Sequence, residues 1–177
     1  MSLALGLDFA TQSARAVILD ENGQIYNRIS KDLAPVITGS DGSRRQDPQS
    51  WLDALDFLVS ASLKYAEVNK LRVSSLAITA TSGTFVLCDE SGSAVSQGVM
   101  YNDGTAKTPL ERAALQNLPG NYFKHVPEFL ISHLTGEKNI AADWSHSLKS
   151  GFDLKNKQWE VKSELKLPDV VAPGTKL

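Results

Sequence analysis

Apolar positions in the first thirty residues form three short stretches that polar turns separate. Residues 4–7 form an apolar run that is typical of a buried strand, and residues 14–19 continue as a second strand. Residues 20–23 read Asp-Glu-Asn-Gly, a turn signal, and residues 25–29 alternate as a third strand. Because the connection at residues 9–13 is too short for a crossover, the first two strands are predicted to be antiparallel neighbours.

Residues 46–68 have the character of a helix. Pro48 suits a first helical turn, where its missing N–H is not needed. The segment that leads into this helix and overlaps its start, residues 38–50, is rich in Gly, Ser and Asp and is predicted to be a loop. Apolar residues lie near helical spacing at four positions: Trp51, Leu55, Leu58 and Leu63.

Two further strand segments follow this helix. Residues 72–80 are predicted to form a strand, and residues 84–103 a hairpin that turns at residues 89–93. The order of elements resembles the mixed sheet of the ribonuclease-H-like fold, in which three antiparallel strands precede a helix and parallel strands. The chain is therefore predicted to be an α/β protein, with the turns after its first and fourth strands at the same sheet edge.

The remainder of the chain is predicted to contain short helices and turns. These are a helix at residues 109–118, a helix that ends at Gly136, a helix at residues 144–149, a turn at residues 154–159 and an extended end from residue 167.

Composition narrows the function classes. The chain has 177 residues, of which 42% are hydrophobic, enough for one globular domain with a core. With 18 basic and 20 acidic residues and no basic block, nucleic-acid binding gains no electrostatic support. No apolar run approaches the ~20 residues of a membrane span, and no secretory signal is visible, so a cytoplasmic location is expected. The lone thiol, Cys88, is interpreted as a small core residue.

The first candidate site is the turn between the first two strands. Asp8 ends an apolar strand, and Thr11, Gln12 and Ser13 follow it directly. Hydroxyl and backbone N–H groups around one point suit a phosphate, and a carboxylate suits the magnesium ion that accompanies it. The alternative is that Asp8 only caps the turn with its own side chain.

Three other segments could contact a ligand. Residues 80–84 place Thr81 and Ser82 in a hydroxyl-lined turn, and Tyr101, Asn102 and Asp103 could stack on and hydrogen-bond a polyol. Both segments are equally ordinary turn sequences. Asp143 is better interpreted as a helix N-cap, with ligand contact as the second interpretation.

Taken together and in order, these segments resemble the FGGY family of carbohydrate kinases. The opening hairpin is similar to the family's phosphate-binding hairpin, and residues 46–55 to its Gln-Asp-Pro…Trp segment. The forms Thr-Ser-Gly-Thr and Tyr-Asn-Asp are nearest in appearance to the ribulose and xylulose kinase branches. Residues 134–159 resemble the family's Leu-Thr-Gly…Asp-Tyr-Ser…Phe-Asp…Trp block.

The resemblance implies an actin-like ATPase domain and ATP-dependent phosphorylation of a sugar such as a pentulose. The implied cofactors are ATP and Mg²⁺, bound through Asp8, Thr11, Gln12 and Ser13, with Asp8 beside the metal. The implied sugar contacts are Thr81, Ser82, Asn102 and Asp103. A small-molecule sugar is the implied partner, and a homodimer is possible on the same grounds.

Three departures from the family pattern qualify this expectation. Ala10 stands where the family has Gly, which would strain the backbone if the position needed a positive φ. The segment between Asp103 and Leu134 is shorter than in the family. The family's catalytic aspartate and nucleotide domain are expected beyond Leu177, so residues 1–177 are interpreted as an incomplete N-terminal domain, inactive alone. The alternative function is a non-catalytic sugar- or protein-binding module on the same fold.

Overall fold

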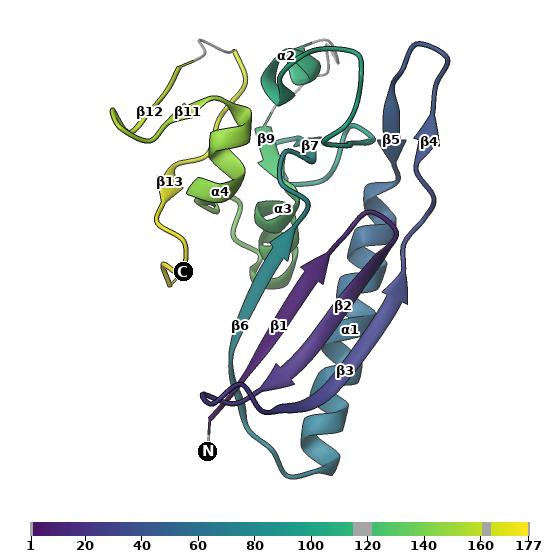
Figure 1. Cartoon of the computed structure of the whole chain (residues 1–177), viewed down its shortest axis with the longest axis vertical. Helices are drawn as coiled ribbons and strands as arrows, with labels where there is room; N and C mark the ends of the chain where they lie inside the picture. The colour runs from purple at the N-terminus through teal and green to yellow at the C-terminus, as the bar shows by residue number, and fades with distance from the viewer. Residues whose placement is uncertain (1, 115–121, 161–163, 177) are drawn as a thin grey trace. The chain divides into compact units, whose positions relative to one another are not determined.

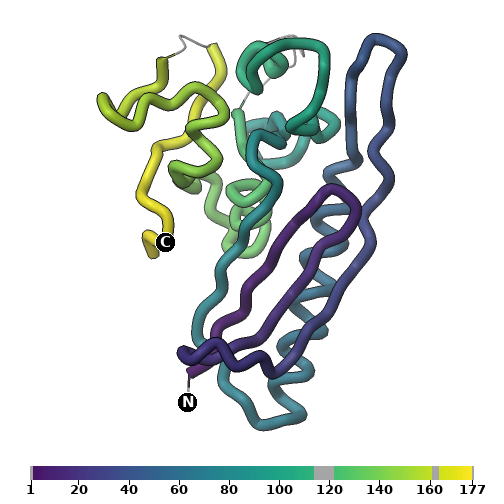
Figure 2. Tube along the Cα trace, in the orientation of Figure 1, coloured from purple at the N-terminus to yellow at the C-terminus, as the bar shows by residue number. Residues whose placement is uncertain are grey.

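A computed structural model of the chain describes residues 2–114, 122–160 and 164–176. The chain divides into two compact units, which Figures 1 and 2 trace from the N-terminus in purple to the C-terminus in yellow. The first unit comprises Met1–Pro35 and Gln49–Ala80, and the second comprises Val36–Pro48 and Thr81–Leu177.

The first unit is built on a four-stranded mixed sheet with the order β3-β2-β1-β6 (Figure 1). β1 pairs antiparallel with β2, β2 pairs antiparallel with β3, and β1 pairs parallel with β6. This is the predicted arrangement of three antiparallel strands followed by a parallel one, and the α/β fold class is confirmed. The strands are β1 (Leu3–Phe9), β2 (Ser13–Leu19), β3 (Ile25–Asp32) and β6 (Val73–Ala80).

Helix α1 (Pro48–Val68) packs against β3 and supplies much of the core of this unit. The Tyr65 hydroxyl donates a hydrogen bond to the Tyr26 carbonyl (2.8 Å), and the Lys31 ammonium lies 5.3 Å from the centre of the Phe57 ring. Leu63 was predicted on the apolar face but is 49% exposed, because the preceding Ser62 turns inward at that point. The buried side chains alternate along β1 and recur along α1: Leu3, Leu5, Leu7, Phe9, Trp51, Leu55 and Leu58.

The second unit contains an antiparallel sheet with the order β4-β5-β8-β7-β9. The predicted hairpin is confirmed, since Phe85 pairs with Val99. The prediction of a loop over residues 38–50 is wrong in part, because residues 37–46 form a hairpin around the Asp41 turn. Apart from Ile37 its strand residues are polar, so no hydrophobic alternation revealed them. The strands are β4 (Ile37–Thr38), β5 (Arg44–Gln46), β7 (Phe85–Cys88), β8 (Gly98–Val99) and β9 (Tyr122–His125).

In the described part of the second unit, three α-helices and a 3₁₀ turn accompany the sheet. α2 (Pro109–Ala114) matches the start of the helix predicted at residues 109–118, whose last four residues lie outside the described ones. α3 (Val126–Thr135) ends as predicted at Gly136, which has a φ of 76°. α4 (Trp144–Ser147) continues into a 3₁₀ turn, η1 (Leu148–Ser150).

The core of this unit lies between the sheet and α2. Phe85 and Phe123 stack with their ring centres 4.8 Å apart, and Leu87, Val99 and Leu110 are buried beside them. Cys88 is fully buried on β7, as predicted, and burial raises the pKa of its thiol to about 12. The thiol therefore stays protonated at neutral pH and behaves as a small apolar group.

Two short strand pairs lie between residues 142 and 171. β10 (Ala142–Asp143) pairs in parallel with β13 (Val170–Val171), and β11 (Phe152–Asp153) pairs with β12 (Gln158–Trp159). The turn predicted at residues 154–159 is confirmed for residues 154–157, which join β11 to β12, while residues 158–159 belong to β12. Among the described residues, no helix is both long and apolar enough to span a bilayer.

Candidate functional site

The opening hairpin presents Asp8 toward solvent. Asp8 lies opposite Arg15 across β1 and β2, and their charged atoms are 3.7 Å apart, with the side chains 50% and 60% exposed. Their sequence neighbours Leu7, Phe9 and Ala14 are buried on the other side of the strands. Within the described residues, the Asp8 carboxylate accepts no hydrogen bond from the turn, so the structure gives no support to a turn cap.

The turn itself is closed by its backbone. The Ala10 N–H donates to the Ser13 carbonyl (3.1 Å), and the Leu33 N–H donates to the Gln12 carbonyl (2.9 Å). Ala10 is not among the described non-glycine residues with positive φ, which are Lys70 and Lys157. The strain considered for Ala at this position is therefore absent from the backbone.

The hairpin fits a magnesium ion that arrives with a phosphate better than a metal held by protein alone. Asp8 offers one accessible carboxylate, and in the described part of the chain no group of three or more His, Cys, Asp or Glu could hold a metal. Magnesium keeps waters and takes few carboxylates when phosphates supply its other ligands. The polar residues Thr11, Gln12 and Ser13 lie at the partly exposed tip of the same hairpin.

In the second unit, the structure brings together three of the predicted segments. Thr84 closes the hydroxyl turn by donating its N–H to the Thr81 carbonyl (3.3 Å), and its own Oγ1 accepts from the Tyr101 N–H (3.2 Å). Ser82 donates its hydroxyl to the Ser145 carbonyl (2.8 Å). Residues 81–84, 100–103 and 143–147 are thus linked by direct hydrogen bonds.

Gly83 gives this turn its backbone conformation. Its φ is +85°, and a Cβ placed on it would lie 3.7 Å from the Cβ of Tyr101 and 3.6 Å from that of Lys149. The left-handed conformation favours glycine here. Tyr101, which is 45% exposed, and Lys149 therefore border the hydroxyl turn.

Asp143 caps helix α4, as predicted. Its Oδ1 accepts hydrogen bonds from the Ser145 N–H (2.8 Å), the Ser145 hydroxyl (2.5 Å) and the His146 N–H (3.1 Å). Burial acts to raise the pKa of Asp143, but the hydrogen bonds from Ser145 and His146 outweigh it and hold the pKa below its usual value. The cap fixes the backbone that carries the Ser145 carbonyl.

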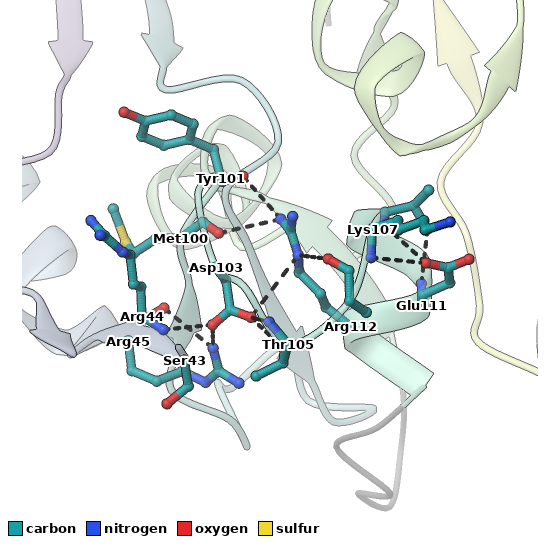
Figure 3. Close-up of polar contacts among 12 residues, drawn as sticks. Ser43, Arg44, Arg45, Met100, Tyr101, Asp103, Thr105, Lys107, Glu111 and Arg112 are labelled. Atoms are coloured by element: carbon teal, nitrogen blue, oxygen red, sulfur yellow. Dashed lines mark hydrogen bonds and ion pairs between the residues drawn. The ribbon is translucent and has the colours of Figure 1, made fainter. Parts of the chain in front are cut away.

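Asp103 is buried and both of its carboxylate oxygens are engaged by this chain (Figure 3). Oδ2 forms an ion pair with Arg45 and accepts from the Arg44 N–H (2.6 Å). Oδ1 accepts from the N–H (3.0 Å) and the hydroxyl of Thr105. Asp103 therefore joins the β4–β5 hairpin to residues 100–105, while its neighbour Asn102 is exposed.

Arg112 supports the same loop from helix α2. Its Nε donates to the Ala106 carbonyl (2.9 Å) and its Nη1 to the Tyr101 carbonyl (3.0 Å), while Nε lies 4.0 Å from the Asp103 carboxylate (Figure 3). Sequence reasoning missed both arginines: Arg45 lies far along the chain from Asp103, and Arg112, although only nine residues away, belongs to no local turn motif.

The second unit contains a group of buried polar side chains that hydrogen-bond to one another. His125 Nδ1 and the His125 N–H both contact Glu128 Oε2 (3.0 and 2.7 Å), and His125 Nε2 contacts Ser150 Oγ (2.8 Å). The His146 ring lies 5.6 Å from the His125 ring. All four side chains are buried, so a diffusing substrate has no access to them, and their role is to tie α3 to η1. Sequence reasoning did not identify this group: His125 and Glu128 have the capping-box spacing at the start of α3, but Ser150 comes from a later segment.

Comparison with known proteins places the chain in a family. The model of the N-terminal domain of the FGGY family of carbohydrate kinases matches residues 3–126. The chain belongs to the FGGY family of carbohydrate kinases. Xylulose kinases are similar in sequence: 26% identity over 113 residues to the one from Bacillus subtilis (strain 168), covering 62% of this chain and 21% of that protein. The xylulose kinase of Staphylococcus epidermidis is 18% identical over 125 residues, covering 71% of this chain and 25% of that protein.

Solved structures confirm the actin-like ATPase fold of this FGGY protein. A ligand-bound xylulose kinase from Lactobacillus acidophilus has a TM-score of 0.79 at 16% identity, covering 98% of this chain and 42% of that one. A glycerol kinase from Plasmodium falciparum, solved with ADP, has a TM-score of 0.77 at 18% identity, covering 96% of this chain and 43% of that one. The chain thus spans about a quarter of the curated relatives' length and less than half of these solved chains.

Proposed function

We propose that this FGGY protein contributes the phosphate- and sugar-contacting part of a kinase that transfers the γ-phosphoryl group of ATP to a pentulose. Membership of the carbohydrate kinase family carries the proposal. The xylulose kinases among its relatives favour a pentulose over other sugars. Phosphoryl transfer depends mainly on positioning and charge stabilisation, so separate residues can serve the two substrates.

Asp8 is proposed to face magnesium, with Thr11, Gln12 and Ser13 at the phosphate groups. The accessibility of Asp8 supports this role, because the carboxylate can exchange its exposed Arg15 partner for a hydrated cation without exposing core. The bound ion would neutralise charge on the transferred phosphate. The protein's part is to hold a carboxylate at a fixed position on a hairpin whose strands pair in register from Ala4 to Phe9.

The sugar is proposed to lie against Thr81, Ser82 and Asn102. Ser82 is partly exposed, and Tyr101 and Asn102 in the neighbouring loop are exposed. Met100 and Asp103 in the same loop are buried. A direct sugar contact by Asp103 stays a prediction. Its engaged carboxylate favours an indirect part, in which Asp103 fixes the loop that presents Tyr101 and Asn102.

The proposal places the catalytic aspartate and the adenosine-binding domain outside residues 1–177. The short span of this chain relative to its family supports it. Residues 1–177 mixed with magnesium, ATP and either ribulose or xylulose should therefore form no sugar phosphate above background in a coupled ADP assay. Steady pentulose-dependent ADP release by this chain would contradict the proposal.

Substitution of Asp8 tests the assignment of the hairpin. In the protein at its native length, Asp8→Asn keeps the side-chain shape and removes the charge, so turnover should fall by at least about 100-fold. Arg15→Gln is the matched control, because it breaks the same ion pair and leaves the carboxylate in place.

A substrate panel of xylulose, ribulose, glycerol and gluconate identifies the sugar. Binding of a sugar without phosphorylation would favour the non-catalytic binding-module alternative.

A further inference from the structure

We propose that Ser82 recognises its ligand only as a hydrogen-bond acceptor, so that the ligand hydroxyl beside it must donate. The inference rests on the proposed function, namely that a sugar lies against the turn at residues 81–84. It adds a direction to that contact, and the direction sets which substituents the site accepts.

The hydroxyl proton of Ser82 is already donated to a backbone carbonyl. Ser82 Oγ lies 2.8 Å from the Ser145 carbonyl oxygen, and a carbonyl can only accept. A serine hydroxyl has one proton and two lone pairs, so the proton lies on the Ser145 side and only lone pairs remain for a ligand. Ser82 is partly exposed, which leaves these lone pairs accessible.

The Ser145 carbonyl cannot easily turn away to release that proton. Asp143 Oδ1 accepts from the N–H groups of Ser145 and His146, which fixes the first turn of α4. α4 runs directly into η1, whose last residue, Ser150, is held by the buried His125. The carbonyl is thus anchored from both sides.

The surroundings of Ser82 suit a polyol. The turn lies beside Tyr101 and Lys149, because a Cβ placed on Gly83 would be 3.7 Å from the Cβ of Tyr101 and 3.6 Å from that of Lys149. The exposed part of the Tyr101 ring can cover the C–H face of a sugar, since aromatic faces pack on apolar surface. Lys149 supplies donors only, so it complements an acceptor-only Ser82.

Analogues with one altered hydroxyl distinguish the two directions of this contact. Fluorine in place of a hydroxyl can accept weakly but cannot donate, and hydrogen can do neither. If Ser82 accepts, the deoxy and fluoro analogues at the contacted position should both bind about 5–10-fold more weakly than the parent pentulose, the usual effect of one neutral hydrogen bond. If Ser82 donates, the fluoro analogue should retain part of the affinity.

The experiment measures dissociation constants by calorimetry for the protein at its native length with xylulose or ribulose and their monodeoxy and monofluoro series. Ser82→Ala should abolish the discrimination at one position and leave the others unchanged, and Ser82→Thr should restore it. Ser145→Ala is the matched control, because it keeps the backbone carbonyl and should preserve the pattern.

Each outcome bears on a separate claim. A fluoro analogue that binds like the parent at the Ser82-dependent position overturns the acceptor assignment and leaves the proposed function intact. Discrimination that survives Ser82→Ala at every position shows that Ser82 is a structural contact and also overturns the inference. If no pentulose binds the unaltered protein at millimolar concentration, the proposed function itself fails.

Discussion

Two ion pairs in this chain consist of the same residue types, aspartate and arginine, but differ in their exposure to solvent. Asp8 and Arg15 face each other on the opening hairpin, 3.7 Å apart and at least half exposed. Asp103 is fully buried, its partner Arg45 is 20% exposed, and the carboxylate also accepts from Arg44 and Thr105. Sequence patterns indicated a ligand role for both aspartates, but only Asp8 has a carboxylate that solvent can reach.

The difference shows how burial assigns roles to identical side chains. An exposed ion pair is screened by water and contributes little to stability, so Asp8 is available for a charged ligand. A buried carboxylate that loses its partners leaves an uncompensated charge, so Asp103 is bound to the architecture around it. The predictions below test this contrast.

The largest effect is expected for Asp103→Ala. Removing the carboxylate leaves Arg45 without its ion-pair partner and the N–H groups of Arg44 and Thr105 without their acceptor, so the free energy of unfolding should fall by about 3–5 kcal/mol. Urea denaturation followed by fluorescence measures it. Asn102→Ala, at the exposed neighbour, is the control and should change the free energy by less than about 0.5 kcal/mol. Similar small losses in both variants would show that Asp103 does not hold this loop.

A smaller loss is expected at Thr84, which links the hydroxyl turn to the loop of Asp103. Thr84→Val keeps the shape but removes the acceptor of the Tyr101 N–H, so unfolding should become easier by about 1–3 kcal/mol. Thr84→Ser retains the oxygen and should lose about 1 kcal/mol or less, the effect of one buried methyl group. Equal losses would assign the effect to packing alone.

Acid should weaken the second unit through His146. Burial, and then the nearby His125, lower the pKa of His146 below 6.5, so the unfolded chain binds its proton more readily. Stability is then full above pH 6.5 and falls as the pH drops toward the folded-state pKa, by at most about 1.4 kcal/mol per pH unit. Melting temperatures between pH 5 and 8 measure the slope, and His146→Asn should flatten it. An unchanged slope in that variant would remove His146 as the cause.

The smallest change in stability is expected for Asp8→Asn. The exposed pair with Arg15 should contribute at most about 0.5 kcal/mol, so the melting temperature should barely move while magnesium-dependent turnover falls. Differential scanning fluorimetry provides the comparison. A melting shift as large as that of Asp103→Ala would return Asp8 to a structural role.

Local signals were sufficient to predict most of the fold. Alternation in β1, the Asp20 turn, Pro48 at the start of α1 and Gly136 after α3 each act within a few residues, and all were recognised. The hairpin at residues 37–46 was missed because its strand residues are polar apart from Ile37, and because β5 pairs with β8, more than fifty residues away.

The candidate site was predictable in part. Asp143 was recognised as a cap because the N–H groups that donate to its carboxylate belong to Ser145 and His146, within three residues of it. The contact of Asp103 with Arg45 and the contact of His125 with Ser150 each join distant segments, and no local pattern encodes them. The turns at residues 81–84 and 100–103 were found as candidates, but only the structure shows that hydrogen bonds join them.

Double-mutant cycles on the two ion pairs test the central contrast most directly. The coupling free energies between Asp103 and Arg45, and between Asp8 and Arg15, are measured by urea denaturation of each single and double variant. We predict a coupling of at least about 1.5 kcal/mol for the buried pair and no more than about 0.5 kcal/mol for the exposed pair. Equal couplings, or a larger one between Asp8 and Arg15, would contradict this account.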